Sequence, residues 1–225
     1  MSAASVSGQR RPPTRRVRQP AEVVAAYRVC ERFQKIIATD LDFSHAFDAT
    51  FTTNPKRRRE IAIAEGEFGD VDFSKVDDAT LVDAFKNRMQ IIYLMLPLVS
   101  PANEEEMQLF FPPSVRAIFE RKPAEESDDF SAYGRQLKSD ATAFRAHLDQ
   151  LARRYPSVAE RMRTFKTELS RKIELPRQKV RPLTAYSRGQ VLGVREKYYQ
   201  IGNYSVIREA GQMRIIGIRF FTRLF

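Results

Sequence analysis

The sequence has no tryptophan and a single cysteine, Cys30, among its 225 residues. One cysteine cannot form a disulfide within the chain, which fits a reducing compartment. Residues 1–20 hold no apolar stretch behind their arginines, so they do not resemble a secretory signal. The longest apolar run, at 91–99, is too short to span a bilayer and contains Pro97. We therefore expect a soluble, cytoplasmic protein.

Histidine is also scarce, with His45 and His147 only. Asp42, His45 and Asp48 would fall at three-residue steps on a helix, a spacing at which neighbouring side chains could approach one metal ion. However, a related segment has Lys75 in place of His45, and no acid lies three residues before His147. We therefore predict no metal site and no cofactor.

Motifs of enzyme active sites are absent as well. The sequence has no glycine-rich phosphate loop, no nucleophile elbow and no cysteine pair. A site assembled from residues scattered along the chain would leave no such signature. We lean against an enzyme and keep an enzyme with scattered site residues as an alternative.

Positive charge is abundant but unevenly placed, and the net charge is +10. Residues 1–20 contribute +5 and residues 171–225 contribute +9, whereas residues 21–170 contribute −4. Such asymmetry often accompanies binding to nucleic acid or to another anionic partner. Alternatively, the basic ends rest on the acidic body or only favour solubility.

Residues 1–19 are rich in serine, proline and arginine, which predicts a disordered basic tail. We expect a helical domain at 20–173. Its first helix, from Pro20 to about Thr39, has apolar residues at helical spacing. Cys30 belongs to this apolar face, so we interpret it as a small buried side chain and not as a nucleophile. The face consists of Val23, Tyr27, Cys30, Phe33 and Ile37.

Prolines divide the rest of the helical domain. Pro55 is expected to start a helix, and Pro97 is expected to end a central, buried one. Pro112-Pro113 should separate two short helices, with Ser114 as the cap of the second.

Heptad-like spacing of apolar residues runs from Ala141 to Leu169. Pro156 interrupts it, and Ser157 with Glu160 matches a capping box, which predicts a fresh helix start. We expect two helices packed in the protein's own core. A kinked dimeric coiled coil is the alternative.

Two segments, 41–61 and 71–91, share nine identical residues at an offset of thirty. One explanation is a possible duplication of a helical unit, although two copies are too few for a free-standing repeat protein. The other is convergence, because aspartate and serine are common helix caps. Convergence does not explain the matching basic and apolar residues further along, so we favour duplication.

The C-terminal part has a different pattern. Residues 174–190 contain prolines and basic residues and predict an extended linker, followed by an antiparallel β-meander at 191–225. Glu209–Gln212 should form a hairpin turn with Gly211 in the left-handed conformation. Strict alternation after this turn puts two sets of residues on opposite faces: Ile216, Ile218, Phe220 and Leu224 on one, and Ile215, Arg219, Phe221 and Arg223 on the other.

These patterns predict a mainly α protein, an irregular multi-helix bundle with a small C-terminal antiparallel β-meander packed on it (α+β). We expect a non-catalytic interaction or scaffold protein that presents a basic, aromatic C-terminal face to an unknown protein or other anionic partner. Sequence-tolerant nucleic-acid binding is an alternative, since aromatic rings stack on bases and arginines contact phosphates. A third interpretation is that these residues are structural, with the aromatic rings packed between the sheet and the helices. The candidate contact residues are Arg208, Arg214, Arg219, Phe221 and Arg223.

Overall fold

In the part of the chain that the computed structural model describes, eight α-helices precede or flank a small antiparallel sheet, which confirms the predicted α+β fold. The described residues are 19–66, 68–99, 104–120, 130–171, 173–175, 180–184 and 197–218.

The first helix, α1 (Ala21–Asp40), buries the predicted apolar face. Cys30 is fully buried in it, and this burial raises the pKa of the thiol, so the group is a neutral core side chain. The helix ends at Asp40, and the following residue, Leu41, adopts the left-handed conformation (φ 56°) and donates its N–H to the carbonyl of Ile37. The turn at Leu41 leads directly into the next helix.

The two related segments begin alike and then diverge. Asp42 caps a helix by accepting the N–H of His45, and Asp72 caps a 3₁₀ turn by accepting the N–H of Ser74. The first segment then forms two helices, whereas the second forms the short turn and one long helix. The elements concerned are α2 (Phe43–Thr50), α3 (Pro55–Glu65), η1 (Phe73–Lys75) and α4 (Asp78–Val99). The shared residues therefore take different places in the two segments, since Asp48 lies in the last turn of α2 whereas Asp78 begins α4, and the duplication stays a prediction.

Pro55 begins α3, as predicted, but Pro97 does not end α4. The helix continues to Val99, with Pro97 in its last turn. There the proline removes one backbone hydrogen bond. Leu94 and Leu98, both fully buried, hold this turn in the core.

A break at Phe111-Pro112 separates α5 (Glu104–Phe110) from α6 (Pro113–Glu120), as expected. However, α6 already begins at Pro113, so Ser114 lies inside the helix and the prediction that it caps the helix is wrong.

The break at Tyr155-Pro156 is confirmed. Tyr155 is extended (φ −123°, ψ 106°) between α7 (Phe130–Arg154) and α8 (Pro156–Leu169). The predicted capping box is wrong, because Pro156 is the first helical residue and Tyr155 caps without a side-chain hydrogen bond. The apolar face of α7 packs against α4 and α8 of the same chain.

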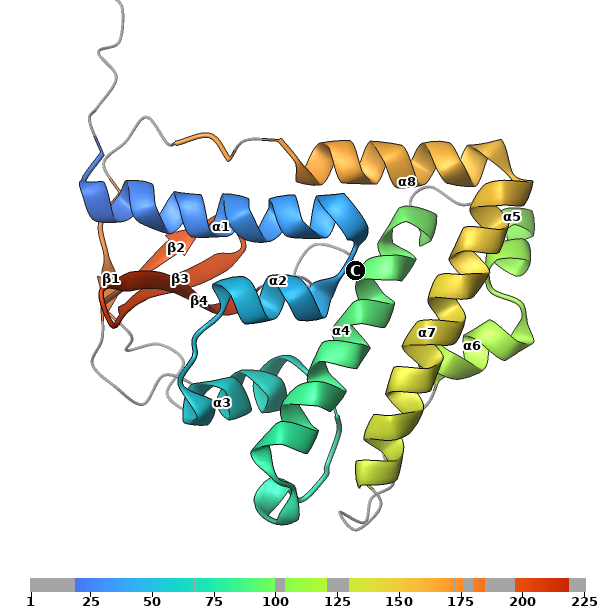
Figure 1. Ribbon diagram of the computed structural model, residues 1–225, viewed down its shortest axis with the longest axis horizontal. Helices are drawn as coiled ribbons and strands as arrows, with labels where there is room; N and C mark the ends of the chain where they lie inside the picture. Colours follow the sequence, from blue (N-terminus) through green and yellow to red (C-terminus); the bar gives the residue numbers. More distant parts are fainter. Residues whose placement is uncertain are drawn as a thin grey trace, which may run out of the picture.

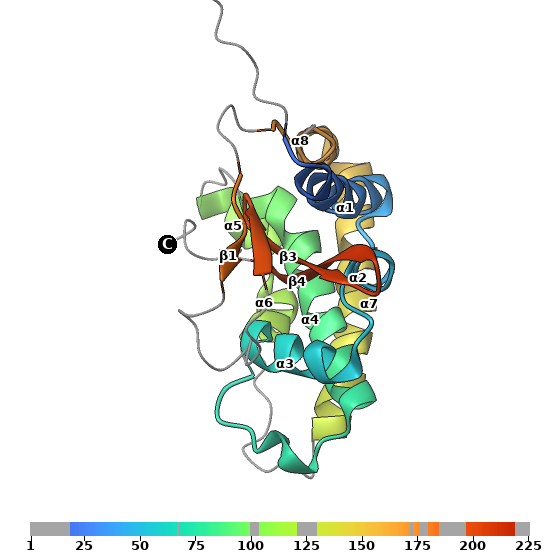
Figure 2. The same ribbon diagram turned by 90° about the vertical axis from the view of Figure 1, so that its left-hand side faces the viewer.

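Figures 1 and 2 show how these helices are arranged. Helices α1 and α8 run side by side in opposite directions, and α4 and α7 form a second pair beside them. The sheet lies against α1, while α5 lies beside the C-terminal end of α7 and α6 lies beside its middle. One buried cluster extends through helices and sheet.

The sheet has the strand order β1-β2-β3-β4, and its last three strands form the predicted meander. Positive φ angles at Ala210 (45°) and Gly211 (82°) in the turn between β3 and β4 fit a type I′ hairpin and confirm the left-handed Gly211. Two residues within the predicted linker at 174–190 form the short first strand. The strands are β1 (Leu183–Thr184), β2 (Lys197–Ile201), β3 (Tyr204–Glu209) and β4 (Gln212–Ile218).

A β-bulge interrupts the pairing of β3 with β4. Ser205 pairs with Gly217, but Val206 pairs with Ile215, so Ile216 is an extra residue. Tyr204 and Val206 share a face of β3, so their partners Ile218 and Ile215 share a face as well, and the prediction that Ile215 and Ile218 lie on opposite faces is wrong. Ile215 and Ile216 are both buried.

Backbone contacts attach the sheet to the helices. The N–H of Thr52 donates to the carbonyl of Ile215 over 3.0 Å, and Phe51 and Ile215 form an isolated parallel bridge. The ring of Tyr204 meets that of Phe33 in α1 edge to face, with centroids 5.7 Å apart. The sheet is thus packed on the helices, as predicted.

Candidate interaction surface

Arg208 and Arg214, two of the five predicted contact residues, lie on opposite faces of the sheet. Arg208 pairs with Met213 across the hairpin, whereas Arg214 pairs with Ile207. Directly paired residues share a face and neighbours alternate, so the two guanidinium groups cannot form one strip.

Arg208 faces α1. Its Nη1 lies 2.9 Å from Oε1 of Glu22, and the hydroxyl of Tyr199 donates to Oε2 of the same carboxylate over 2.7 Å. The hydrogen bond from Tyr199 contributes most, and together with Arg208 it lowers the pKa of Glu22. The group fastens β2 and β3 to the start of α1, although 61% of the Arg208 side chain stays exposed.

Arg214 faces the other way, toward α2. Its guanidinium donates to the carbonyl of Ala49 over 3.2 Å and to the side chain of Gln212 over 2.9 Å. The carbonyl of Ala49 lies in the last turn of α2, where helix carbonyls lack intrahelical partners. Arg214 therefore joins the sheet to this helix.

The aromatic rings of the sheet belong to the core. Tyr198, Tyr199 and Tyr204 are all buried, so for these three the structural role holds. The remaining contact candidates, Arg219, Phe221 and Arg223, lie outside the described residues, and as contact residues they stay a prediction.

A basic stripe along α1, consisting of Arg28, Arg32 and Lys35, is a feature that the sequence reasoning missed. The three side chains are exposed and follow one another at four- and three-residue steps on the solvent side of the helix. Within the described residues, none of the three makes a side-chain hydrogen bond or ion pair. The signal was present in the sequence, because these residues occupy the helix positions opposite the apolar face.

The basic run at 56–59 behaves differently. Arg58 pairs with Asp48 over 2.7 Å, and its guanidinium also lies 4.7 Å from the ring centre of Phe47. Arg59 pairs with Asp78 over 2.6 Å and donates to the carbonyls of Phe73 and Val76. These arginines hold α2, α3 and the start of α4 together, so they are structural.

Most of the net positive charge of the chain lies on residues other than the described ones. The described residues carry 24 lysines and arginines and 22 aspartates and glutamates, a net charge of +2. The other residues of the chain account for the remaining +8. The described residues are nearly neutral, and the basic excess belongs to the other residues of the chain.

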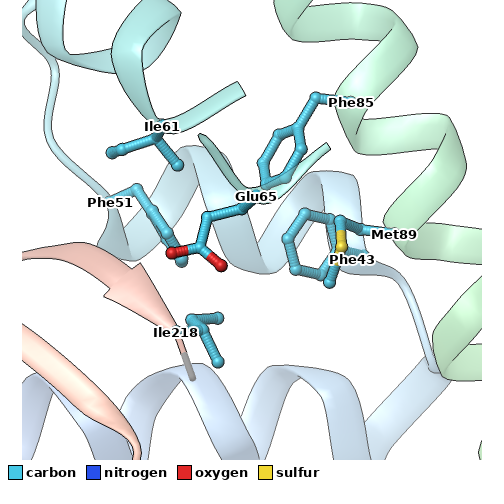
Figure 3. Close-up of a pocket in the computed structure, with 7 residues that line it drawn as sticks. All are labelled: Phe43, Phe51, Ile61, Glu65, Phe85, Met89 and Ile218. Carbon is cyan, nitrogen blue, oxygen red and sulfur yellow. The ribbon is translucent and has the colours of Figure 1, made fainter. Parts of the chain in front are cut away.

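A small cavity lies between the end of α3, α4 and β4 (Figure 3). Its walls are apolar except for the carboxylate of Glu65, which points toward the phenyl rings. The cavity holds about 10 Å³, room for about one water molecule. It is too small for an organic substrate. Its lining consists of Phe43, Phe51, Ile61, Glu65, Phe85, Met89 and Ile218.

A larger, open hollow of about 320 Å³ lies between α4, α5 and α6. Its walls are almost wholly apolar, and the one charged member, Arg116, donates its Nε–H to the carbonyl of Phe111 over 2.7 Å. The hollow has the size of a site for a side-chain cluster or a small ligand. It is lined by Met95, Val99, Met107, Phe111, Arg116 and Phe119.

Neither histidine lies in a metal-ligand cluster. His147 Nε2 lies 2.9 Å from the carbonyl of Phe110 and ties α7 to α5, and the exposed ring of His45 lies 4.0 Å from Asp40. Across the residues that the structure describes, there is no group of three or more His, Cys, Asp or Glu side chains placed to hold a metal ion.

Comparison with known proteins gives no relative: no family model, no curated protein and no solved structure matches this chain. The helices in the described ranges also include none with the length and apolar character needed to cross a membrane.

Proposed function

We propose that this chain is a non-catalytic interaction protein that binds an anionic partner through basic groups. The observation that carries the proposal is the separation of charge. Arg58, Arg59 and Arg214 are used in ion pairs or bonds to carbonyls. Among the residues that the structure describes, the exposed stripe of Arg28, Arg32 and Lys35 has no such partners.

The stripe is long enough to meet several anionic groups. Seven residues of helix separate Arg28 from Lys35, which is about 10 Å along the axis. Aligned like charges repel one another, and an anionic partner relieves that repulsion and is also steered toward the surface. The basic segment at 1–18 directly precedes the helix and adds five arginines.

The C-terminal strip of Arg219, Phe221 and Arg223 is proposed as a second contact with the same partner. Arg208 and Arg214 serve chiefly as ties between sheet and helices in this proposal. Arg208 can still contribute, because most of its side chain faces solvent.

The test compares three double charge reversals that change the net charge equally. Arg28→Glu/Arg32→Glu alters the stripe, and Arg219→Glu/Arg223→Glu alters the C-terminal strip. The control, Arg135→Glu/Lys138→Glu, reverses two exposed residues of α7 that have no ion pair within the described residues. Each protein is titrated by fluorescence anisotropy with a labelled polyglutamate peptide and with single-stranded nucleic acid, at low and near-physiological salt.

We expect each of the first two variants to weaken binding of one probe about tenfold, a loss of about 1.4 kcal/mol, with little change in the control. An equal loss in all three variants would reduce the effect to net charge alone, and absence of binding to both probes would refute the proposal. Preferential binding of nucleic acid, with a steep dependence on salt, would identify the alternative function.

A further inference from the structure

Helix α4 carries a half-buried apolar strip that leads from the small cavity to the open hollow. The strip consists of Ile92, Met95, Leu96 and Val99, all partly exposed and packed on the core. At its lower end lies Met89, which lines the cavity together with Ile218, the last described residue of β4 (Figure 3). At its upper end, Met95 and Val99 line the hollow.

The chain beyond Ile218 has the length to follow this strip. From Met89 to Val99 the helix rises about 15 Å. The six residues from Ile218 to Leu224 reach about 20 Å when extended. The path from the end of β4 to the hollow is therefore within reach.

The alternation of side chains also suits the strip. Ile218 points into the cavity beside α4, and in an extended chain Phe220 and Leu224 share its face. The opposite face carries Arg219, Phe221 and Arg223.

We propose that residues 219–224 dock on α4, with Phe220 against Ile92 and Leu96, and with Leu224 in the hollow between α4, α5 and α6. This inference rests on the proposed function, since the docked segment would present Arg219, Phe221 and Arg223 outward as the contact strip. Burial of two bulky apolar side chains drives the docking.

The absence of tryptophan gives a direct test, because any introduced tryptophan is the only one in the protein. We would make Phe220→Trp, Phe221→Trp and Leu224→Trp in the full chain and record emission and quenching by acrylamide without any partner. The expected result is emission at shorter wavelength and several-fold weaker quenching for the first and third variants than for the second. Equal exposure of all three, or the greatest protection for Phe221→Trp, would overturn the docking.

A matched pair of surface changes tests the hollow itself. Met107 lines the hollow and is 37% exposed, whereas Ile63 lies on α3 and is 38% exposed. Met107→Asp should shift the emission of Leu224→Trp to longer wavelength, and Ile63→Asp should not. The same result for both changes would place Leu224 elsewhere, and a protection that vanishes on dilution would assign the hollow to a second copy of the chain.

The two proposals fail separately. If all the tryptophans are exposed but the charge reversals still weaken partner binding, the docking is wrong and the proposed function stands. If the tryptophans are protected but neither probe binds, the segment docks and the proposed function is wrong.

Discussion

At the scale of single residues, Asp48 shows how this fold uses its charges. The carboxylate accepts Nη2 of Arg58 at 2.7 Å and Nζ of Lys86 at 3.0 Å, and both cations lie near the ring of Phe47. Partial burial raises the pKa of Asp48, but the bonds from Lys86 and Arg58 outweigh it and the net shift is downward. The ionised form is therefore stabilised by folding.

Replacing this carboxylate should change how stability depends on pH. A lowered folded-state pKa contributes stability above the unfolded value of about 3.9, and the contribution is lost as the pH falls through the folded value. We expect Asp48→Asn to lose about 0.5–1 kcal/mol of unfolding free energy at neutral pH, and less below about pH 4. Urea titrations from pH 7 to pH 3 measure both curves. Asp70→Asn, at an exposed loop residue, serves as the control at neutral pH, and a loss for Asp48→Asn that does not depend on pH would contradict this account.

At the scale of elements, Gln90 fixes α4 to the corner between α1 and α2. Its Nε2 donates to the carbonyl of Leu41 over 2.6 Å, and its Oε1 accepts the N–H of Phe43 over 2.8 Å. Both backbone groups belong to buried residues, so water cannot readily replace the amide.

Removing this amide should loosen the corner. Gln90→Leu keeps a side chain of similar size but leaves the N–H of Phe43 without its acceptor, so we expect a loss of about 2 kcal/mol. The carbonyl of Leu41 keeps a bond from Arg145. Gln150→Leu, at an exposed position of α7, should cost little by comparison. Chemical denaturation measures both, and equal stability of the two variants would show that the buried amide is not needed.

At the scale of the whole molecule, the sheet is part of the same core as the helices. Ile201, Val206 and Ile215 are fully buried in the cluster that contains Val23 and Phe33 of α1. A sheet this small is marginal in water without such a partner.

We therefore predict a single unfolding transition for helices and sheet. Hydrogen exchange of the strand amides, followed across a urea titration, should give the same midpoint as the helical circular dichroism signal. Deletion of residues 197–225 should abolish this cooperative transition, because it uncovers the apolar surface of α1. An earlier, separate loss of protection in the strands would instead mark the sheet as an independent module.

Whether the sequence could predict a feature of the candidate site depends on how far apart along the chain the residues that determine that feature lie. The turn at Ala210-Gly211 depends on its own residues, and the sequence predicted it. The placement of Arg208 and Arg214 depends on pairing across the hairpin and on contacts with Glu22 and Ala49, more than 160 residues away along the chain. Such contacts leave no local pattern.

The sequence by itself determined the α+β class, the helix start at Pro55, the break at Tyr155-Pro156 and the buried face of α1, because spacing and proline geometry act within a few residues. Only the tertiary structure decided that α4 continues through Pro97, that a bulge interrupts the alternation between Ile215 and Ile218, and that the basic stripe of α1 has no ion partner among the described residues. The physical reason is that each of these depends on which distant surfaces pack together, and burial energy there outweighs local preference.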